Sequence, residues 1–185
     1  NHKEQCLMNM NKIKNIDIED YWYIINYNYD QIQFAEVKAT AVISIYSLIF
    51  GLGYTLDILD EENIYFFSAD LSGLVHSILF IISIVLIIAS IRRCVMCILP
   101  RFNFSIEKSP LFFGDISKYK NFKVFYESLE EVLNDETKYR KHLTQSVFAT
   151  ANIASTKFEN VNKGLKHLLK SIFFIILFFI SIYAL

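Results

Sequence analysis

The feature that most constrains this chain is a set of apolar stretches that carry no charged side chain. Residues 39–56 and 71–91 run for 18 and 21 positions without Asp, Glu, Lys or Arg. A helix of about 20 mainly apolar residues crosses the roughly 30 Å hydrocarbon layer of a bilayer. A helix also satisfies its own backbone hydrogen bonds, for which lipid offers no partner. The sequence therefore predicts two transmembrane helices.

A third stretch, residues 171–185, has 15 uncharged positions. At about 1.5 Å per residue it covers about 22 Å, which is short of the full layer. Leu168 and Leu169 extend it if the Lys170 amine reaches back to the interface. We therefore predict a third transmembrane helix. With 54% hydrophobic residues, five Gly and two Pro, the composition favours long helices over strands and turns.

The basic residues predict how the chain is oriented in the bilayer. All 18 Lys and Arg lie in residues 1–38 or 92–170. The segment 57–70 contains none and instead has five acidic residues: Asp57, Asp60, Glu61, Glu62 and Asp70. Because short basic segments stay cytoplasmic, we expect a cytoplasmic N-terminal segment, 1–38, and an acidic external loop, 57–70. The expected fold is all-α, with three transmembrane helices and a cytoplasmic helical module, 92–170, between the second and third.

Local signals subdivide the cytoplasmic residues. Ile18–Lys38 is aromatic-rich and is expected to run as a helix directly into the first span. Pro100 is expected to end the second helix. Asp115 or Ser117 is expected to cap the next helix. The apolar stripe of that helix would contain Tyr119, Phe122, Tyr126, Leu129 and Leu133.

A longer helical pattern begins at the start signal Asn134-Asp135. Apolar residues then recur every three or four positions, and no Pro intervenes before the end of the chain: Tyr139, Leu143, Val147, Ala151, Ala154, Phe158, Val161, Leu165 and Leu168. One helix of about 50 residues would be roughly 75 Å long and would couple a cytoplasmic event to the membrane. The alternative is an ordinary antiparallel pair of helices that cover each other's apolar faces.

No pattern of catalytic or metal-binding residues emerges. The sequence lacks nucleophile-elbow, P-loop, zinc-protease and dinucleotide-binding motifs. Cys94 and Cys97 form a CxxC without the further ligands that a zinc site needs, so we interpret them as apolar packing residues. The spans lack the central charges typical of ion-coupled transporters. With a net charge of −1, nucleic-acid binding is also not expected. We expect a membrane protein that is not an enzyme, has no cofactor or metal and assembles as a homo-oligomer.

Several segments resemble elements of the Pycsar transmembrane effector family. Ala35-Glu36-Val37-Lys38-Ala39-Thr40 is similar to an Ala-Asp-x-Lys-Ala-Ser element that leads into the first span. Leu99-Pro100-Arg101 and the Phe112-Phe113-Gly114-Asp115-Ile116 segment are similar to Leu-Pro-Arg and Phe-Phe-Gly-x-Ile elements. Ile153 to Phe158 resembles Ile-x-x-x-Lys-Tyr/Phe. The resemblance covers about 33–185, with Glu36 in place of the usual Asp and without the Asn often found in the first span.

The resemblance implies an antiphage defence effector of the bacterial inner membrane. A partner cyclase would make cUMP or cCMP on infection, and the effector would respond by impairing membrane integrity, which leads to abortive infection. Cationic, aromatic and helix-start residues in the similar segments are the candidate nucleotide contacts: Lys38, Phe112, Phe113, Gly114, Asp115 and Lys157. For Phe112 and Phe113, core packing is the alternative to base stacking, and for Asp115 the alternative is a helix cap.

A second hypothesis of a different class is a non-signalling membrane scaffold or toxin-like pore-forming protein without a nucleotide ligand. The sequence leaves open which nucleotide is sensed, the number of subunits, and whether damage is a pore or general disruption.

Overall fold

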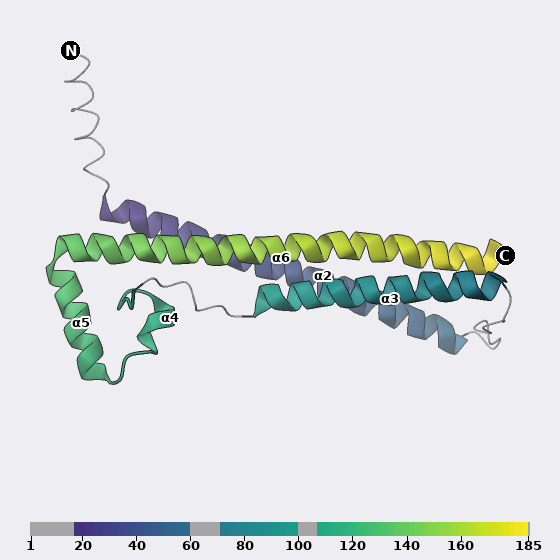
Figure 1. The fold of residues 1–185 in the computed structure, drawn as a ribbon, viewed down its shortest axis with the longest axis horizontal. Coiled ribbons are helices and arrows are strands. Elements are labelled where there is room, and N and C mark those ends of the chain that lie inside the picture. The colour runs from purple at the N-terminus through teal and green to yellow at the C-terminus, as the bar shows by residue number, and fades with distance from the viewer. Residues whose placement is uncertain (1–16, 60–70, 100–106, 185) are drawn as a thin grey trace, which may run out of the picture. The chain divides into compact units, whose positions relative to one another are not determined.

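The computed structural model describes residues 17–59, 71–99 and 107–184, and the regular elements in these ranges are all α-helices (Figure 1). They are α2 (Ile18–Leu59), α3 (Leu71–Ile98), α4 (Phe113–Ile116), α5 (Phe122–Asn134) and α6 (Glu136–Ala184). Helices α2, α3 and α6 are each long and apolar enough to cross a membrane. The prediction of an all-α fold with three spans is confirmed.

Helices α2, α3 and α6 all extend beyond their uncharged stretches. The 42-residue α2 begins at Ile18 and continues into the first span, as predicted. The 49-residue α6 joins the second apolar pattern to the third span without a break. Helix α3 continues to Ile98, seven residues past the last uncharged position of its span; Pro100, expected to end it, lies outside the described residues. The single long helix, rather than a pair of helices, is the arrangement adopted.

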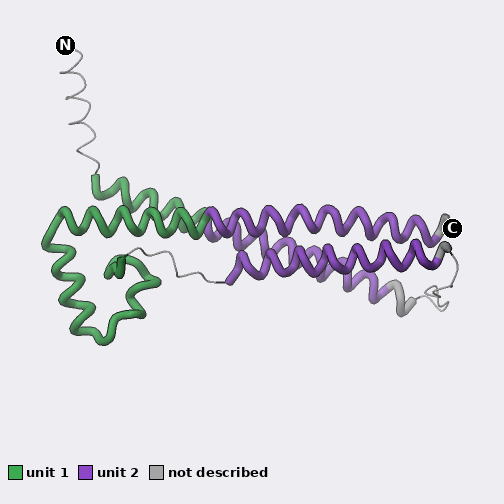
Figure 2. Tube along the Cα trace, viewed as in Figure 1, with its two compact units in different colours: residues 1–31, 101–154 green, residues 32–100, 155–185 purple. Residues whose placement is uncertain are grey.

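Contacts divide the chain into two compact units (Figure 2). Unit 1 comprises residues 1–31 and 101–154, and unit 2 comprises residues 32–100 and 155–185. Helices α2 and α6 therefore each contribute residues to both units. This division follows contacts rather than a bilayer, so the membrane boundaries expected from the sequence stay predictions.

In unit 2, the buried residues of all three helices other than Gly73 and Asn160 recur at alternating spacings of three and four, the pattern of helices packed along a common seam. Many of these residues are small or polar rather than large and apolar. They are Ala35, Ala39, Val42 and Tyr46 of α2, Ser83, Ile87, Ser90, Cys94 and Cys97 of α3, and Lys157, Val161, Gly164, Leu168 and Ser171 of α6. Small side chains let helix backbones approach closely where lipid supplies no hydrophobic driving force.

The contacts in unit 2 also fix the register of the helices. Helix α3 is antiparallel to α6, because the residue numbers of each contacting pair add up to 253 or 254: Ser90 with Gly164, Arg93 with Asn160, and Cys97 with Lys157. Helix α2 is parallel to α6, because the two residue numbers of each contacting pair differ by a nearly constant 121 to 125: Glu36 with Lys157, Phe34 with Phe158, and Tyr46 with Ser171.

In unit 1, polar contacts join the first part of α2 to the first part of α6. The Trp22 indole N–H donates to the Tyr139 hydroxyl at 3.2 Å. The buried Asn28 amide donates to the Thr150 hydroxyl at 3.0 Å. Asp135 begins α6, as predicted, because its carboxylate accepts from the backbone N–H groups of Thr137 and Lys138.

Two sequence expectations for unit 1 are wrong. The helix after α4 is capped by Asn121, whose side chain accepts from the Val124 backbone N–H, and not by Asp115 or Ser117. The predicted stripe on α5 is not a buried face, because Phe122, Tyr126 and Leu133 are exposed.

The predicted apolar stripe of α6 also needs correction. Ala151 and Leu165 are exposed, whereas the buried face contains polar residues such as Ser146 and Thr150. An apolar criterion misses this face because close helix packing selects small side chains as well as apolar ones.

Candidate functional site

The most unusual side chain in unit 2 is the buried cation of Lys157. Its side chain is only 3% exposed, and its ammonium lies 2.6 Å from a Glu36 carboxylate oxygen. The same ammonium donates to the Cys97 carbonyl and, at 3.4 Å, to the Leu99 carbonyl. One nitrogen of α6 therefore binds both α2 and the end of α3.

The end of α3 explains why a cation is favourable there. The last carbonyls of a helix have no partner within the helix, and they carry the negative end of its dipole. Cys97 and Leu99 lie at this end, since α3 finishes at Ile98. Lys157 supplies these carbonyls with donors, and Glu36 balances its charge. A buried ammonium without such partners would be strongly disfavoured.

Lys38 lies near this cluster on α2, but its side chain is exposed. Its ammonium is 4.2 Å from the centroid of the Phe34 ring and 5.5 Å from that of Phe158. A cation over aromatic faces at these distances makes a cation–π contact. Phe158 follows Lys157 directly, so the two predicted lysine contacts are brought together around one turn of α6.

Sequence segments that are far apart therefore meet at one place in unit 2. Residues 35–40 supply Glu36 and Lys38, residues 153–158 supply Lys157 and Phe158, and Leu99 comes from the segment after the second span. We call Glu36, Lys157 and the Cys97 and Leu99 carbonyls the lysine junction. Pro100 and Arg101 lie outside the described residues.

The other predicted contacts lie in unit 1, around α4. Asp115 is 1% exposed, and its carboxylate accepts from the Ser109 backbone N–H at 3.1 Å and from the Lys118 ammonium at 2.7 Å. Phe112 and Gly114 are buried, whereas Phe113 is 70% exposed. Asp115 thus stabilises the turn between Ser109 and α4. Of the two phenylalanines, Phe113 faces solvent and Phe112 does not.

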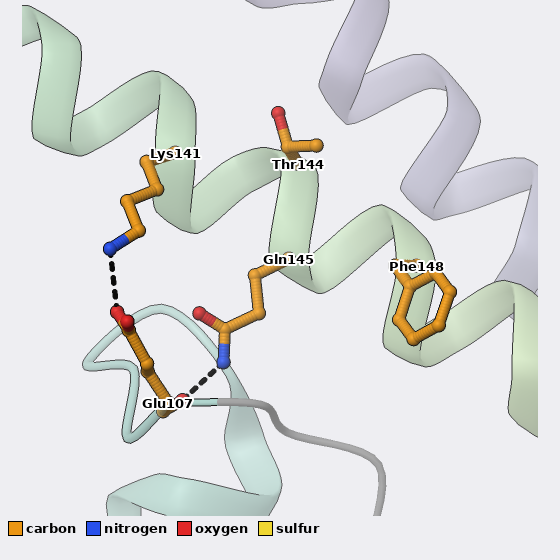
Figure 3. A pocket seen from close by; sticks show the side chains of 5 residues that line it. All are labelled: Glu107, Lys141, Thr144, Gln145 and Phe148. Atoms are coloured by element: carbon orange, nitrogen blue, oxygen red, sulfur yellow. Dashed lines mark hydrogen bonds and ion pairs between the residues drawn. The ribbon is translucent and has the colours of Figure 1, made fainter.

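Unit 1 also contains a pocket that the sequence did not reveal. It has a volume of about 460 Å³ and is lined by Glu107, Lys141, Thr144, Gln145 and Phe148 (Figure 3). The Lys141 ammonium lies 2.7 Å from the Glu107 carboxylate, which lowers the pKa of that carboxyl. The Gln145 amide donates to the Glu107 carbonyl, and the Phe148 ring is 52% exposed. Nothing in the sequence links Glu107 to α6, because it precedes Lys141 by 34 positions.

The volume of this pocket suits a small organic ligand, for which pockets of about 300–1,000 Å³ are usual. Lys141 offers a cation to an anionic group, Thr144 and Gln145 offer hydrogen bonds, and Phe148 offers an aromatic face. Among the described residues, no group of three or more His, Cys, Asp or Glu side chains is placed to hold a metal ion.

Comparison with known families identifies the chain. A family model described as "Pycsar effector protein domain" matches residues 20–185. The chain belongs to this family. The match spans both units and all three membrane-length helices, and it makes the protein a Pycsar antiphage effector that resides in a membrane. No curated protein and no solved structure matches this Pycsar effector.

Proposed function

We propose that this Pycsar effector binds cUMP or cCMP, made by a partner cyclase on infection, and responds by impairing the inner membrane. The observation that carries the proposal is the family match over residues 20–185. We further propose that it acts without catalysis, since the sequence contains no catalytic motif. We also propose a homo-oligomer, because three spans enclose little by themselves.

The register of unit 2 supports the proposed orientation. Helices α2 and α6 run in one direction and α3 runs in the other. Lys38, Arg92 and Lys157 therefore lie towards the same end of the three helices. If this end is cytoplasmic, the N-terminal segment and residues 92–170 are cytoplasmic and residues 57–70 are external.

We place the nucleotide in the pocket of unit 1. A cyclic mononucleotide carries one phosphodiester charge, which Lys141 would bind, while Phe148 would stack on the base. Lys141 is already paired with Glu107, so the phosphate would have to displace this carboxylate. The displacement gives two states of the loop that carries Glu107, and a ligand acts as a signal only if it favours one state over the other.

The six contacts predicted from the sequence stay predictions, and the structure adds a condition to each group. Lys157 would meet a phosphate only after release from Glu36, and Asp115 would offer an anion rather than a donor. Phe112 and Gly114 are buried. Lys38 and Phe113 are exposed and would reach a ligand without rearrangement.

Purified full-length protein in liposomes tests the proposal. We expect cUMP or cCMP to raise its thermal transition temperature and to release an encapsulated dye, whereas cAMP and cGMP do neither. If none of the four nucleotides binds, or if dye release is the same with and without pyrimidine nucleotide, the gated mechanism is wrong and the non-signalling pore is favoured. Hydrolysis of the nucleotide by the purified chain would contradict the proposed absence of catalysis.

A further inference from the structure

The last lysine before the third span, Lys170, lies deeper along the helix bundle than the charged residues that border the other two spans. On α3 the uncharged stretch 71–91 ends next to Arg92, and on α2 the uncharged stretch 39–56 begins next to Lys38. The α3–α6 register places Lys170 level with Ile84, eight residues beyond Arg92. The α2–α6 register places Lys170 level with residues 45–49, at least seven residues beyond Lys38. Both neighbours therefore put Lys170 at least about 10 Å inside the uncharged zone at 1.5 Å per residue.

Three lysines share this outer face of α6. Lys163, Lys166 and Lys170 are spaced by three and four residues, so they lie on one side of the helix. All three are exposed, whereas Val161, Gly164 and Leu168 form the buried side. We call these lysines the basic face of α6. Charged residues within spans usually point into a bundle or a water-filled cavity, and here they point outward.

The chain does not supply the opposite charge at this depth. Lys163 is paired with Glu159. Within the described part of the chain, neither the Lys166 nor the Lys170 side chain forms a hydrogen bond or an ion pair with another residue. Residues 39–56, 71–91 and 171–185 contain no Asp or Glu, so the spans of a second copy packed in register would offer none either.

We propose that the basic face of α6 binds the phosphates of anionic phospholipids and draws them inward along this helix. Side chains of a helix tilt towards its N-terminus, which for α6 is the end shared with Arg92 and Lys38. A lysine there extends its amine towards the interface, but its four-carbon stem spans roughly half of the depth of Lys170. The lipid headgroups must supply the remaining distance by local thinning of the bilayer, which is the usual response to charge at this depth. The bilayer next to α6 is therefore thinned before any signal arrives.

Lipid selectivity measured without nucleotide tests this surface separately from the proposed gating. Full-length protein is reconstituted in vesicles of equal parts phosphatidylglycerol and phosphatidylcholine, and the lipids retained on extraction are identified by native mass spectrometry. We expect phosphatidylglycerol to be enriched on the wild type. Lys166→Gln/Lys170→Gln should reduce the enrichment by about fivefold for each lysine, the value for a basic residue near an anionic surface.

Matched variants separate charge from folding. Lys120→Gln/Lys123→Gln removes the same charge from exposed residues of unit 1 outside the spans, and it should retain the wild-type enrichment. Lys166→Arg/Lys170→Arg keeps the charge and should also retain it. Equal enrichment in Lys166→Gln/Lys170→Gln and the wild type, or no enrichment on the wild type, would overturn the proposal. Failure of nucleotide binding would leave this result unchanged.

Discussion

At the scale of single residues, the two charged partners of the lysine junction differ in their exposure to solvent. Lys157 and Glu36 form one ion pair, yet the lysine side chain is 3% exposed and the glutamate side chain is 38% exposed. A charge left alone is costly where water cannot reach it and much less so where water can. The two partners should therefore differ in what their removal does to stability.

We predict that Glu36→Gln destabilises the protein more than Lys157→Met. Glu36→Gln leaves a buried ammonium without its counter-charge, which costs about 3–5 kcal/mol. Lys157→Met leaves a carboxylate that water can reach and carbonyls that lose a donor, which costs about 1–3 kcal/mol. The free energies of unfolding in detergent measure both. Glu127→Gln, in the exposed pair with Lys123, is the control and should change stability by less than about 1 kcal/mol.

A double variant sharpens this prediction. Glu36→Gln/Lys157→Met removes both charges, so it should be more stable than Glu36→Gln alone. If the double variant is less stable than either single variant, the buried charge of Lys157 is not the source of the cost.

A second prediction at this scale concerns the proposed nucleotide pocket. Glu107→Gln frees Lys141 and should raise the affinity for the activating nucleotide by no more than about fivefold, since the pair is exposed and water weakens it. Lys141→Gln removes the phosphate donor and should lower the affinity about 10- to 100-fold, as expected for a charged hydrogen bond of about 1.5–3 kcal/mol. Isothermal titration calorimetry measures both. Unchanged affinity in Lys141→Gln would place the site elsewhere.

The pH dependence of nucleotide binding follows from the same pair. The hydrogen bond from Lys141 lowers the pKa of Glu107. The carboxylate therefore competes with the phosphate at neutral pH and stops competing only as the pH falls through this lowered pKa, below the ordinary range of a glutamate. Glu107→Gln should remove this acidic rise in affinity. A rise centred at or above the ordinary glutamate range would contradict the pairing.

At the scale of helices, the close approach of α3 and α6 depends on a position without a side chain. A Cβ added at Gly164 would lie 2.7 Å from the Cys94 sulfur and 3.4 Å from the Ser90 carbonyl oxygen. The Ser90 hydroxyl donates to the Gly164 carbonyl at 2.7 Å. Small residues on both helices thus bring the two backbones together.

We predict that Gly164→Ala destabilises the packing of α3 against α6 by about 1–3 kcal/mol, the cost of overpacking a tight contact. Cys94→Ala removes the atom closest to the new methyl group, so the double variant should regain part of the loss. Gly53→Ala is the control, because its Cβ would meet nothing within 4 Å, and helix propensity should make it neutral or stabilising. Thermal unfolding measures all of them. Equal effects of the two glycine substitutions would contradict the close contact.

The same helices show what the sequence can predict. Uncharged stretches and start signals predicted α2, α3, α6 and the cap at Asp135, because these depend on local composition. The buried seam was missed where it contains Gly164 and Lys157, since an apolar criterion does not select them. The Glu36–Lys157 pair spans 121 positions, and only the register of packed helices brings such residues together.

At the scale of the whole molecule, the same long helices serve two units. Helix α6 contributes residues 136–154 to unit 1 and residues 155–184 to unit 2. It contains Lys141 of the pocket, Lys157 of the junction and the basic face. If the pocket receives the nucleotide and the basic face contacts lipid, one uninterrupted helix joins the ligand to the bilayer. This route is effective only if the pocket is cytoplasmic, where the nucleotide is made.

The last prediction therefore concerns topology. In a variant whose native cysteines, Cys6, Cys94 and Cys97, are replaced by alanine, Glu62→Cys should react with a membrane-impermeant maleimide added to intact cells, and Lys141→Cys should not. The asymmetry of the basic residues is the physical reason, since segments rich in Lys and Arg are retained in the cytoplasm. Lys141→Cys should become reactive once the cells are permeabilised, which shows that its thiol is accessible. Labelling of Lys141→Cys in intact cells would place the pocket outside, away from a cytoplasmic nucleotide, and would overturn both the orientation and the proposed site.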